Sequence, residues 1–200
     1  MYLNDKEFEE VIRRYKDQSA SGLSFIPDLA RMLNYNDCKD LSSDLQFGGH
    51  TWERHKAVKN LANRLPSERG LYMFVWTPPL EFLFANESPS HKLTWVLYVG
   101  KAGVENGTRD TFKDRYQSDY KGKVGTDPKK LWDKIDECRL RDQRLAKYLT
   151  LRPLEYWYLP IRDLGYLTKL ETRLLKLLNP PLNTQHVVRK LHPVKTSPAF

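Results

Sequence analysis

Three side chains of this sequence could act together on a phosphodiester. Tyr72 and Tyr98 each lie near a glycine in a short apolar run, from Gly70 to Trp76 and from Val96 to Lys101, and Glu171 follows in a leucine-rich segment. A phenol can position or deprotonate water if nearby cations lower its pKa from about 10. A carboxylate, with several waters and a substrate phosphate, can hold Mg²⁺. Phenols, cations and a carboxylate are therefore the parts of a phosphodiester-cutting site.

Glu171 interrupts the apolar face of the segment in which it lies. At helical spacing its neighbours on that face are leucines: Leu167, Leu174, Leu175 and Leu178. Because burying an unpaired carboxylate is costly, Glu171 needs a cation, a metal or a raised pKa. The pattern leaves two explanations open: an ion pair with Arg173, Lys176 or a neighbouring strand, or a bound divalent cation.

Two cations could act on the tyrosines. Lys101 ends the second tyrosine run, and Arg115 borders the apolar stripe of a following helix. If the two runs pair as strands, both phenols can point to one face of the sheet, where these cations would lower a phenol pKa. Arg115 could also bind the charge that develops on a phosphoryl group, or it could only form a surface ion pair with Asp114 or Asp119.

The elements that must position these residues begin at Gly70. Aromatic and β-branched runs bounded by Gly or Pro predict three strands: Leu71 to Trp76, Leu93 to Val99 and Leu154 to Ile161. Helical periodicity predicts three helices: Asp110 to Tyr120, Lys129 to Leu149 and Leu167 to Leu178. Phe82 to Phe84 could add a brief strand. The order is strand, strand, helix, helix, strand, helix, and the first two strands are expected to form a hairpin.

The segment before these strands is predicted to be helical. Amphipathic spacing and helix start and stop signals indicate three helices: Asp5 to Gln18, one opened by Pro27, and Thr51 to Leu65. The chain therefore divides into three parts. Residues 1–66 form a helical extension that caps the sheet, dimerises or recognises DNA, residues 67–184 form the main domain, and residues 185–200 form a basic tail.

Composition indicates a globular protein with a polyanionic partner. The 200 residues are 40% hydrophobic and 12% aromatic, which is enough to build a core and excludes a disordered or fibrous class. The net charge is +8. Residues 1–66 hold ten Lys/Arg and ten Asp/Glu, so the excess positive charge belongs to the part that contains the tyrosine runs.

Cysteine usage and hydropathy indicate a soluble, intracellular protein, expected in the cytoplasm. Cys38 and Cys138 have no metal-ligand or disulfide spacing, and the five histidines show no ligand pattern. No apolar run reaches the roughly 18 residues that a membrane span needs, and acidic residues stand where a signal peptide would be basic. No membrane partner is expected.

Lysines after the second tyrosine run could follow a DNA backbone, although such runs are mostly solvated helix faces. They lie in the first helix after the hairpin, in the glycine-containing loop behind it and at the start of the long charged helix: Lys113, Lys121, Lys123, Lys129 and Lys130.

The motifs together resemble the GIY-YIG nuclease superfamily, over roughly residues 70–183. Gly-Leu-Tyr at 70–72 and Tyr-Val-Gly at 98–100 are similar to its two signatures, and the second continues as Tyr-Val-Gly-Lys-Ala, as in the repair branch. An arginine at the first helix is matched by Arg115, the metal-binding glutamate by Glu171, and an asparagine twelve positions later by Asn183. The joint spacing is far more specific than either tripeptide.

The resemblance implies a small α/β (α+β) domain around a three-stranded antiparallel sheet, and hydrolysis of DNA with one divalent metal, Mg²⁺ or Mn²⁺. By the same resemblance Glu171 would hold the metal, Arg115 would bind the scissile phosphate, and Tyr72 or Tyr98 would act on the attacking water. Lys101 would lower a phenol pKa, and Asn183 would support the site.

One departure concerns the residue four positions after the arginine, often His or Tyr in the family. Here it is Asp119, and the neighbouring Tyr120 would substitute if the helix were slightly rotated. The leading expectation is a stand-alone, restriction-like DNA endonuclease that could act as a homodimer. The alternatives are a DNA-binding module that has lost cleavage, a repair incision nuclease, and an interaction protein whose N-terminal helices bind a partner.

Overall fold

The computed structural model describes most of the chain from residue 51 to residue 183. The described residues are 51–78, 80–82, 91–103, 110–125 and 140–183, with the single residues Lys39, Leu41, Ser43, Lys130, Leu131 and Cys138. The first two predicted helices and the basic tail 185–200 lie outside this part, as does most of the first half of the long charged helix. Within the described ranges, no helix has both the length and the apolar character of a membrane span.

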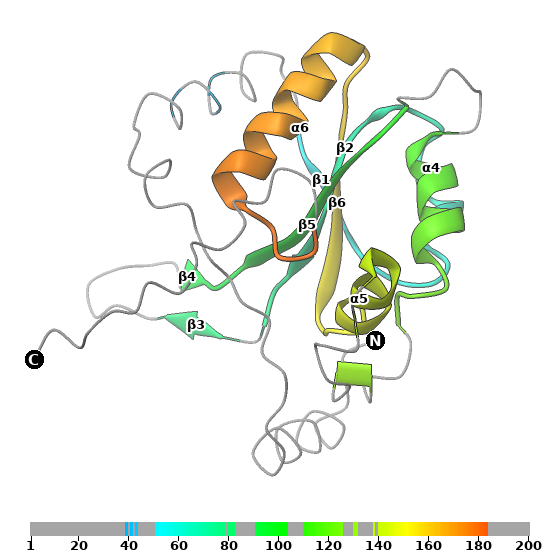
Figure 1. Ribbon diagram of the computed structural model, residues 1–200, viewed down its shortest axis with the longest axis vertical. Coiled ribbons are helices and arrows are strands. Elements are labelled where there is room, and N and C mark those ends of the chain that lie inside the picture. Colours follow the sequence, from blue (N-terminus) through cyan, green and yellow to red (C-terminus); the bar gives the residue numbers. More distant parts are fainter. Residues whose placement is uncertain are drawn as a thin grey trace, which may run out of the picture.

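A four-stranded antiparallel sheet forms the centre of the fold. Its strands, in spatial order, are β1 (Glu53–Lys56), β6 (Leu154–Pro160), β2 (Gly70–Trp76) and β5 (Trp95–Ala102). The three strands that the sequence predicts are β2, β5 and β6, and β2 pairs with β5 as expected. Helices cover both faces (Figure 1), so the chain has the predicted α+β class, with four strands in place of three.

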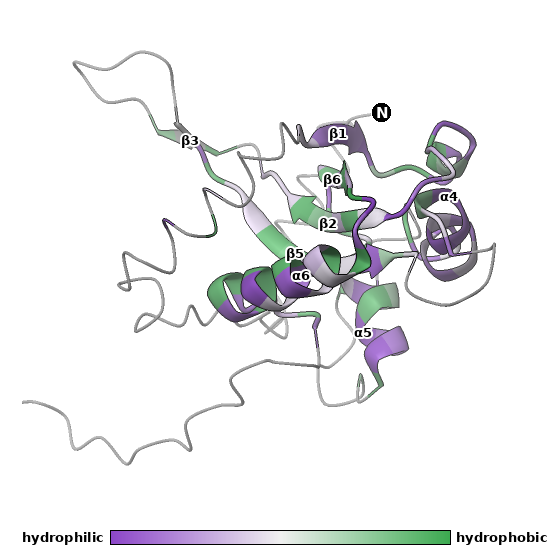
Figure 2. Cartoon of the chain, turned by 90° about the horizontal axis from the view of Figure 1, so that it is seen from above, coloured by the Kyte–Doolittle hydropathy of each residue, from purple (hydrophilic) through white to green (hydrophobic). Residues whose placement is uncertain are grey.

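The fourth strand, β1, shows that one predicted helix is wrong. The segment Thr51 to Leu65 contains β1 and then the short 3-10 helix η1 (Leu61–Asn63). The residues of β1 are hydrophilic throughout (Figure 2), so they give no alternating apolar signal. The edge of β6 selects the strand, because β1 pairs with it along its length and Tyr158 donates a hydrogen bond to Glu53.

The connection between β2 and β5 carries a separate two-stranded ribbon. It consists of β3 (Glu81–Phe82) and β4 (His91–Lys92), which pair antiparallel. The ribbon lies at the far end of the hairpin, beyond the four-stranded sheet (Figure 1). Of the brief strand predicted at Phe82 to Phe84, Phe82 belongs to β3.

One face of the sheet is covered by α6 (Leu164–Leu178), which confirms the last predicted helix. Asp163 caps its N-terminus by accepting a hydrogen bond from the Tyr166 amide, and Asn179 ends it in the left-handed conformation. Because side chains alternate along a strand, every second residue of β2 and β5 meets α6. The buried side chains of this face include Leu71, Met73, Val75, Val99, Leu167, Leu170, Leu174 and Leu175.

The opposite face carries the helices that precede β6. They are α4 (Phe112–Arg115), the π-helical η2 (Tyr116–Tyr120) and α5 (Arg141–Tyr148). The helix predicted over Asp110 to Tyr120 is confirmed, with a change of helix type inside it. The single helix predicted over Lys129 to Leu149 is wrong as one element, because Cys138 lies in no helix, Leu140 is extended, and α5 begins only at Arg141. The core on this face is aromatic and includes Tyr72, Phe74, Phe112, Tyr116, Tyr120 and Tyr156.

Candidate active site

Tyr72 and Gly100 face each other across β2 and β5, and the glycine makes room for the tyrosine. The two residues are partners in the antiparallel register. A Cβ at position 100 would lie 2.6 Å from Cζ and from the hydroxyl oxygen of Tyr72, well inside van der Waals contact. The lack of a side chain at Gly100 therefore leaves the space that the Tyr72 phenol occupies.

The hydroxyl of Tyr72 is hydrogen-bonded to the hydroxyl of Tyr120, with 2.7 Å between the oxygens. Both phenols are buried. The ring of Tyr120 lies 5.8 Å from that of Tyr72 and 6.1 Å from that of Tyr98, measured between centroids. Three phenols from β2, β5 and η2 thus form one cluster, and Tyr72 and Tyr98 lie on the same face of the sheet as expected.

The helix type explains how Tyr120 reaches this cluster. In η2 the amide of Lys121 donates to the carbonyl of Tyr116, five residues earlier, which is the hydrogen bond of a π-helix. A π turn holds more residues than an α turn, so the residue five positions after Arg115 comes over the tyrosines. Asp119, four positions after Arg115, stays partly exposed and contacts the arginine instead. From the sequence, Tyr120 was expected near the tyrosines only if this helix were slightly rotated, and the π turn provides that rotation.

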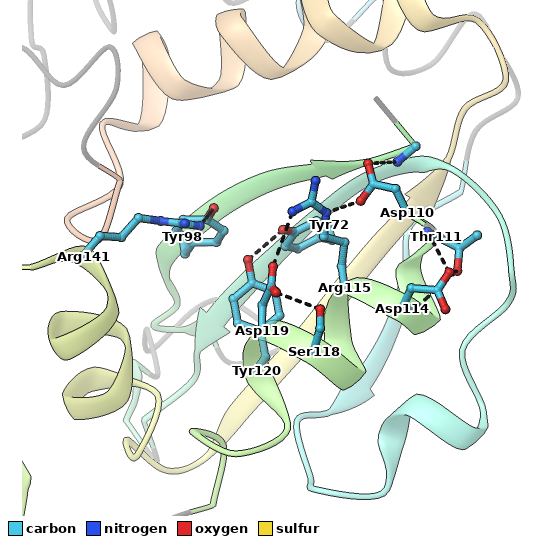
Figure 3. Close-up of polar contacts among 11 residues, drawn as sticks. Tyr72, Tyr98, Asp110, Thr111, Asp114, Arg115, Ser118, Asp119, Tyr120 and Arg141 are labelled. Atoms are coloured by element: carbon cyan, nitrogen blue, oxygen red, sulfur yellow. Dashed lines mark hydrogen bonds and ion pairs between the residues drawn. The ribbon is translucent and has the colours of Figure 1, made fainter. Parts of the chain in front are cut away.

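Tyr98 is contacted from the other side by Arg141, the first residue of α5. The guanidinium donates a hydrogen bond to the Tyr98 hydroxyl and lies 5.2 Å from the centroid of its ring (Figure 3). The phenol therefore has a cation next to both its oxygen and its π face. The sequence gives no local sign of this contact, because α5 is 43 residues from Tyr98.

Arg115 is fixed by two carboxylates. Its Nε donates to Asp110 Oδ1, and its terminal nitrogen lies 3.5 Å from Asp119 Oδ2. Asp110 is itself buried, and its second oxygen accepts a hydrogen bond of 3.0 Å from the Gly103 amide. The guanidinium lies beside Tyr72 (Figure 3). Sequence reasoning missed Asp110, although its position just before the arginine-bearing helix was a usable signal.

Burial controls the protonation of the phenols. Burial raises the pKa of Tyr72 well above 10.0, and the charges of Tyr98 and Tyr156 raise it further. The hydrogen bond from Tyr120 and the positive charge of Arg115 lower it only in part. Burial also raises the pKa of Tyr120. At neutral pH Tyr72 therefore keeps its proton, and the lowered phenol pKa expected from the sequence is not found at this residue.

Lys101 and Glu171 lie on the opposite face of the sheet from the phenols. Lys101 is the register partner of Leu71, whose side chain packs in the α6 core, and its Nζ lies 2.8 Å from Glu171 Oε2. The carboxylate in the leucine face thus has the cation that its position requires, supplied by a neighbouring strand. Lys101 neutralises Glu171, so the cation that was expected to lower a phenol pKa is paired with a carboxylate on the other face of the sheet.

Asn183 closes the outer edge of β5. Its side-chain oxygen accepts a hydrogen bond of 2.9 Å from the Val99 amide, and its side-chain nitrogen donates one of 2.7 Å to the Val99 carbonyl. The Leu182 amide donates to the Leu97 carbonyl beside it. The buried side-chain amide of Asn183 therefore satisfies both backbone groups of Val99, which lies in β5 between Tyr98 and Lys101.

The candidate DNA-binding lysines differ in how accessible they are. Lys113, Lys121 and Lys130 are exposed. Lys123 forms an ion pair of 2.8 Å with Asp142 and is less accessible. Lys129 lies outside the described residues.

A divalent metal fits Glu171 only as a single-carboxylate site. In the part of the chain that the structure describes, no three His, Cys, Asp or Glu side chains gather as metal ligands. Mg²⁺ is commonly held by one or two carboxylates together with waters and substrate phosphates, so one carboxylate is compatible with it. The Lys101 ammonium already pairs with this carboxylate at 2.8 Å.

Comparisons with known proteins give no family assignment. A scan against models of protein families, a search of curated proteins and a search of solved structures each found no match.

Proposed function

We propose that this chain is a divalent-metal-dependent DNA endonuclease, which hydrolyses phosphodiester bonds with a GIY-YIG-type site as a stand-alone, restriction-like enzyme. The observation that carries the proposal is the gathering of Tyr72, Tyr98 and Tyr120 from separate elements beside Arg115. A phosphoryl group in transfer needs fixed donors aimed at its oxygens. A guanidinium held by two carboxylates beside the Tyr72 hydroxyl, which is itself bonded to Tyr120, has this character.

Each group has a role that its surroundings permit. Arg115 binds the scissile phosphate, while Asp110 and Asp119 hold its guanidinium in one orientation. Tyr72 keeps its proton, because burial raises its pKa, so it orients water or a phosphate oxygen through the hydroxyl pair with Tyr120. Tyr98, at the border of the cluster, is then the better candidate for contact with the attacking water.

Glu171 would hold Mg²⁺ or Mn²⁺. When bound, the metal would stabilise negative charge on the phosphate and lower the pKa of a bound water. The ammonium of Lys101 lies 2.8 Å from this carboxylate, so it would have to yield to the metal or stay beside it.

One substrate can contact both the tyrosine cluster and the Lys101–Glu171 pair only around β5, because they lie on opposite faces of the sheet. Tyr98 and Gly100 point to the phenol face, whereas Lys101 points to the α6 face, and β5 ends the sheet on this side. The substrate backbone would lie along this edge. The net positive charge of the chain, and the exposed lysines Lys113 and Lys121, favour DNA as the polyanion.

Cleavage of supercoiled plasmid by the purified chain tests the proposal. We expect nicking or linearisation with Mg²⁺ or Mn²⁺ and none with a chelator. Arg115→Ala and Glu171→Gln should each lower the rate by about a hundredfold or more, the size of the loss when one charge-stabilising group is removed. Glu68→Gln is the matched control, because it removes a carboxylate that is exposed and outside the cluster.

Two results would contradict the assignment. Undiminished cleavage by Glu171→Gln would remove Glu171 from the site. Cleavage lost equally in Glu68→Gln would show that the loss reflects general damage. Thermal unfolding of each variant separates loss of function from loss of fold, since Glu171→Gln also leaves Lys101 without its carboxylate partner.

The second candidate is a DNA-binding module of the same fold without cleavage. Two observations favour it: the Lys101 ammonium neutralises Glu171, and burial raises the pKa of Tyr72. Salt-dependent duplex binding without nicking in Mg²⁺, Mn²⁺, Co²⁺ or Ni²⁺ would support this function over the nuclease.

A further inference from the structure

Arg141 is a cation of the site that none of the matched motifs includes. It is the first residue of α5, in the stretch between Arg115 and β6. Its guanidinium lies 5.2 Å from the centroid of the Tyr98 ring and donates a hydrogen bond to the Tyr98 hydroxyl. Figure 3 shows it on the side of the tyrosine cluster away from Arg115. The three phenols therefore lie between two arginines.

The two arginines differ in how their charge is balanced. Arg115 is paired with Asp110 and Asp119, so its charge is more than matched by carboxylates. Arg141 contacts the hydroxyl and the ring of Tyr98, and no carboxylate pairs with it among the residues that the structure describes. A phosphate would thus meet a neutralised arginine on one side of the cluster and an unneutralised one on the other.

Arg141 is also placed to receive an anion. Its side chain is exposed, whereas that of Arg115 is only partly exposed. The contact with Tyr98 uses one edge of the guanidinium and leaves further N–H donors, which suit the paired oxygens of a phosphodiester. The phenol oxygen and ring restrict how the guanidinium can turn, so less side-chain entropy is lost when a phosphate binds.

We propose that Arg141 binds a second phosphate of the DNA backbone, on the Tyr98 side of the cluster, and that Tyr98 orients its guanidinium for this contact. This inference rests on the proposed function, because it takes DNA as the ligand. It adds a substrate-binding residue and gives Tyr98 a task in binding as well as in hydrolysis.

Binding of a fluorescently labelled duplex, measured by anisotropy in a chelator so that no cleavage occurs, tests the inference over a series of salt concentrations. We expect Arg141→Ala to weaken binding about tenfold at low salt and to reduce the slope of log Kd against log salt by about one, because one phosphate contact is lost. Arg141→Lys should keep the slope and lose part of the affinity. Arg162→Ala, an exposed arginine beyond β6, is the matched control and should leave the slope unchanged.

Combining Tyr98→Phe with Arg141→Ala tests the orienting contact. Tyr98→Phe removes only the hydroxyl that Arg141 contacts, so it should weaken binding in the otherwise unchanged chain and have no further effect with Arg141→Ala. Additive losses would overturn the orienting role. Equal affinities and slopes for Arg141→Ala and Arg162→Ala, with the unchanged chain still binding, would overturn the phosphate contact alone. If the unchanged chain bound no duplex even at low salt, the proposed function would fail and this inference with it.

Discussion

Replacing Gly100 by alanine should disturb the site through packing alone. The new methyl group would lie 2.6 Å from Cζ and the oxygen of Tyr72, about 1 Å closer than carbon atoms tolerate. The Tyr72 ring has little freedom to move. It is 2% exposed, its centroid lies 5.5 Å from that of Tyr156, with the rings stacked, and its hydroxyl is bonded to Tyr120.

The expected cost follows from these contacts. Overpacking of a filled core costs about 1–3 kcal/mol, and loss of the Tyr72–Tyr120 hydrogen bond adds about 1 kcal/mol. Alanine in a strand recovers about 0.5–1 kcal/mol relative to glycine. The net loss is about 1–3 kcal/mol, which lowers the Tm of a chain of this length by roughly 2–12 °C.

Thermal unfolding followed by far-UV circular dichroism measures this loss. Gly122→Ala is the matched control, because a Cβ there has nothing within 4 Å, and it should change stability by less than about 0.5 kcal/mol. Tyr72→Ala removes the ring, so Gly100→Ala should cost much less in that background. Equal Tm values for Gly100→Ala and Gly122→Ala would refute the packing we describe between Gly100 and Tyr72.

Three further outcomes follow from the same contacts. Burial raises the pKa of Tyr72 and Tyr120 above 10.0, so on raising the pH the unfolded chain releases these protons before the folded chain does. The contribution of the two phenols to stability is therefore complete below about pH 10 and is lost as the pH rises further. A Tm that stays level from about pH 9 to about pH 11 would contradict this. Asp110→Asn removes the buried charge that holds Arg115, and should lower the free energy of unfolding in urea by about 1–3 kcal/mol; an unchanged midpoint would show that the pair adds nothing. Asn183→Ala leaves backbone groups of β5 without their partner and should speed hydrogen exchange there by about tenfold, whereas exchange limited to the chain after α6 would refute its bracing role.

The strands of this fold were predictable because their signals are local. Leu71 to Trp76 is apolar, aromatic and bounded by Gly70 and by Thr77-Pro78, and β2 covers Gly70–Trp76. The strand β1 was not predictable in this way, because its four hydrophilic residues are held by the edge of β6, about a hundred residues later. Pairing with a distant strand overrode local helical character.

In the candidate site, too, local strand patterns were predictable from the sequence and contacts between distant elements were not. The shared face of Tyr72 and Tyr98 follows from strand pairing and is confirmed by the 6.2 Å between their ring centroids. The position of Lys101 was also within reach of the sequence, since a residue three positions after Tyr98 must point to the other face of a strand. The contact of Arg141 with Tyr98 was not, because it depends on where α5 packs.

The structure also separates the motif residues that packing explains from those that it does not. Gly100 is required by the volume of Tyr72, and Gly70 has no room for a Cβ, which would lie 2.1 Å from the Leu159 carbonyl oxygen. The glycines of both tripeptides are therefore explained by packing and would be needed in a protein of this fold with or without catalysis. Arg115 and Glu171 are different, because partly burying a guanidinium or a carboxylate costs desolvation that its ion pair must offset, so packing alone does not call for them. Arg115→Ala and Glu171→Gln are therefore the substitutions that decide whether the tyrosine cluster serves a nuclease.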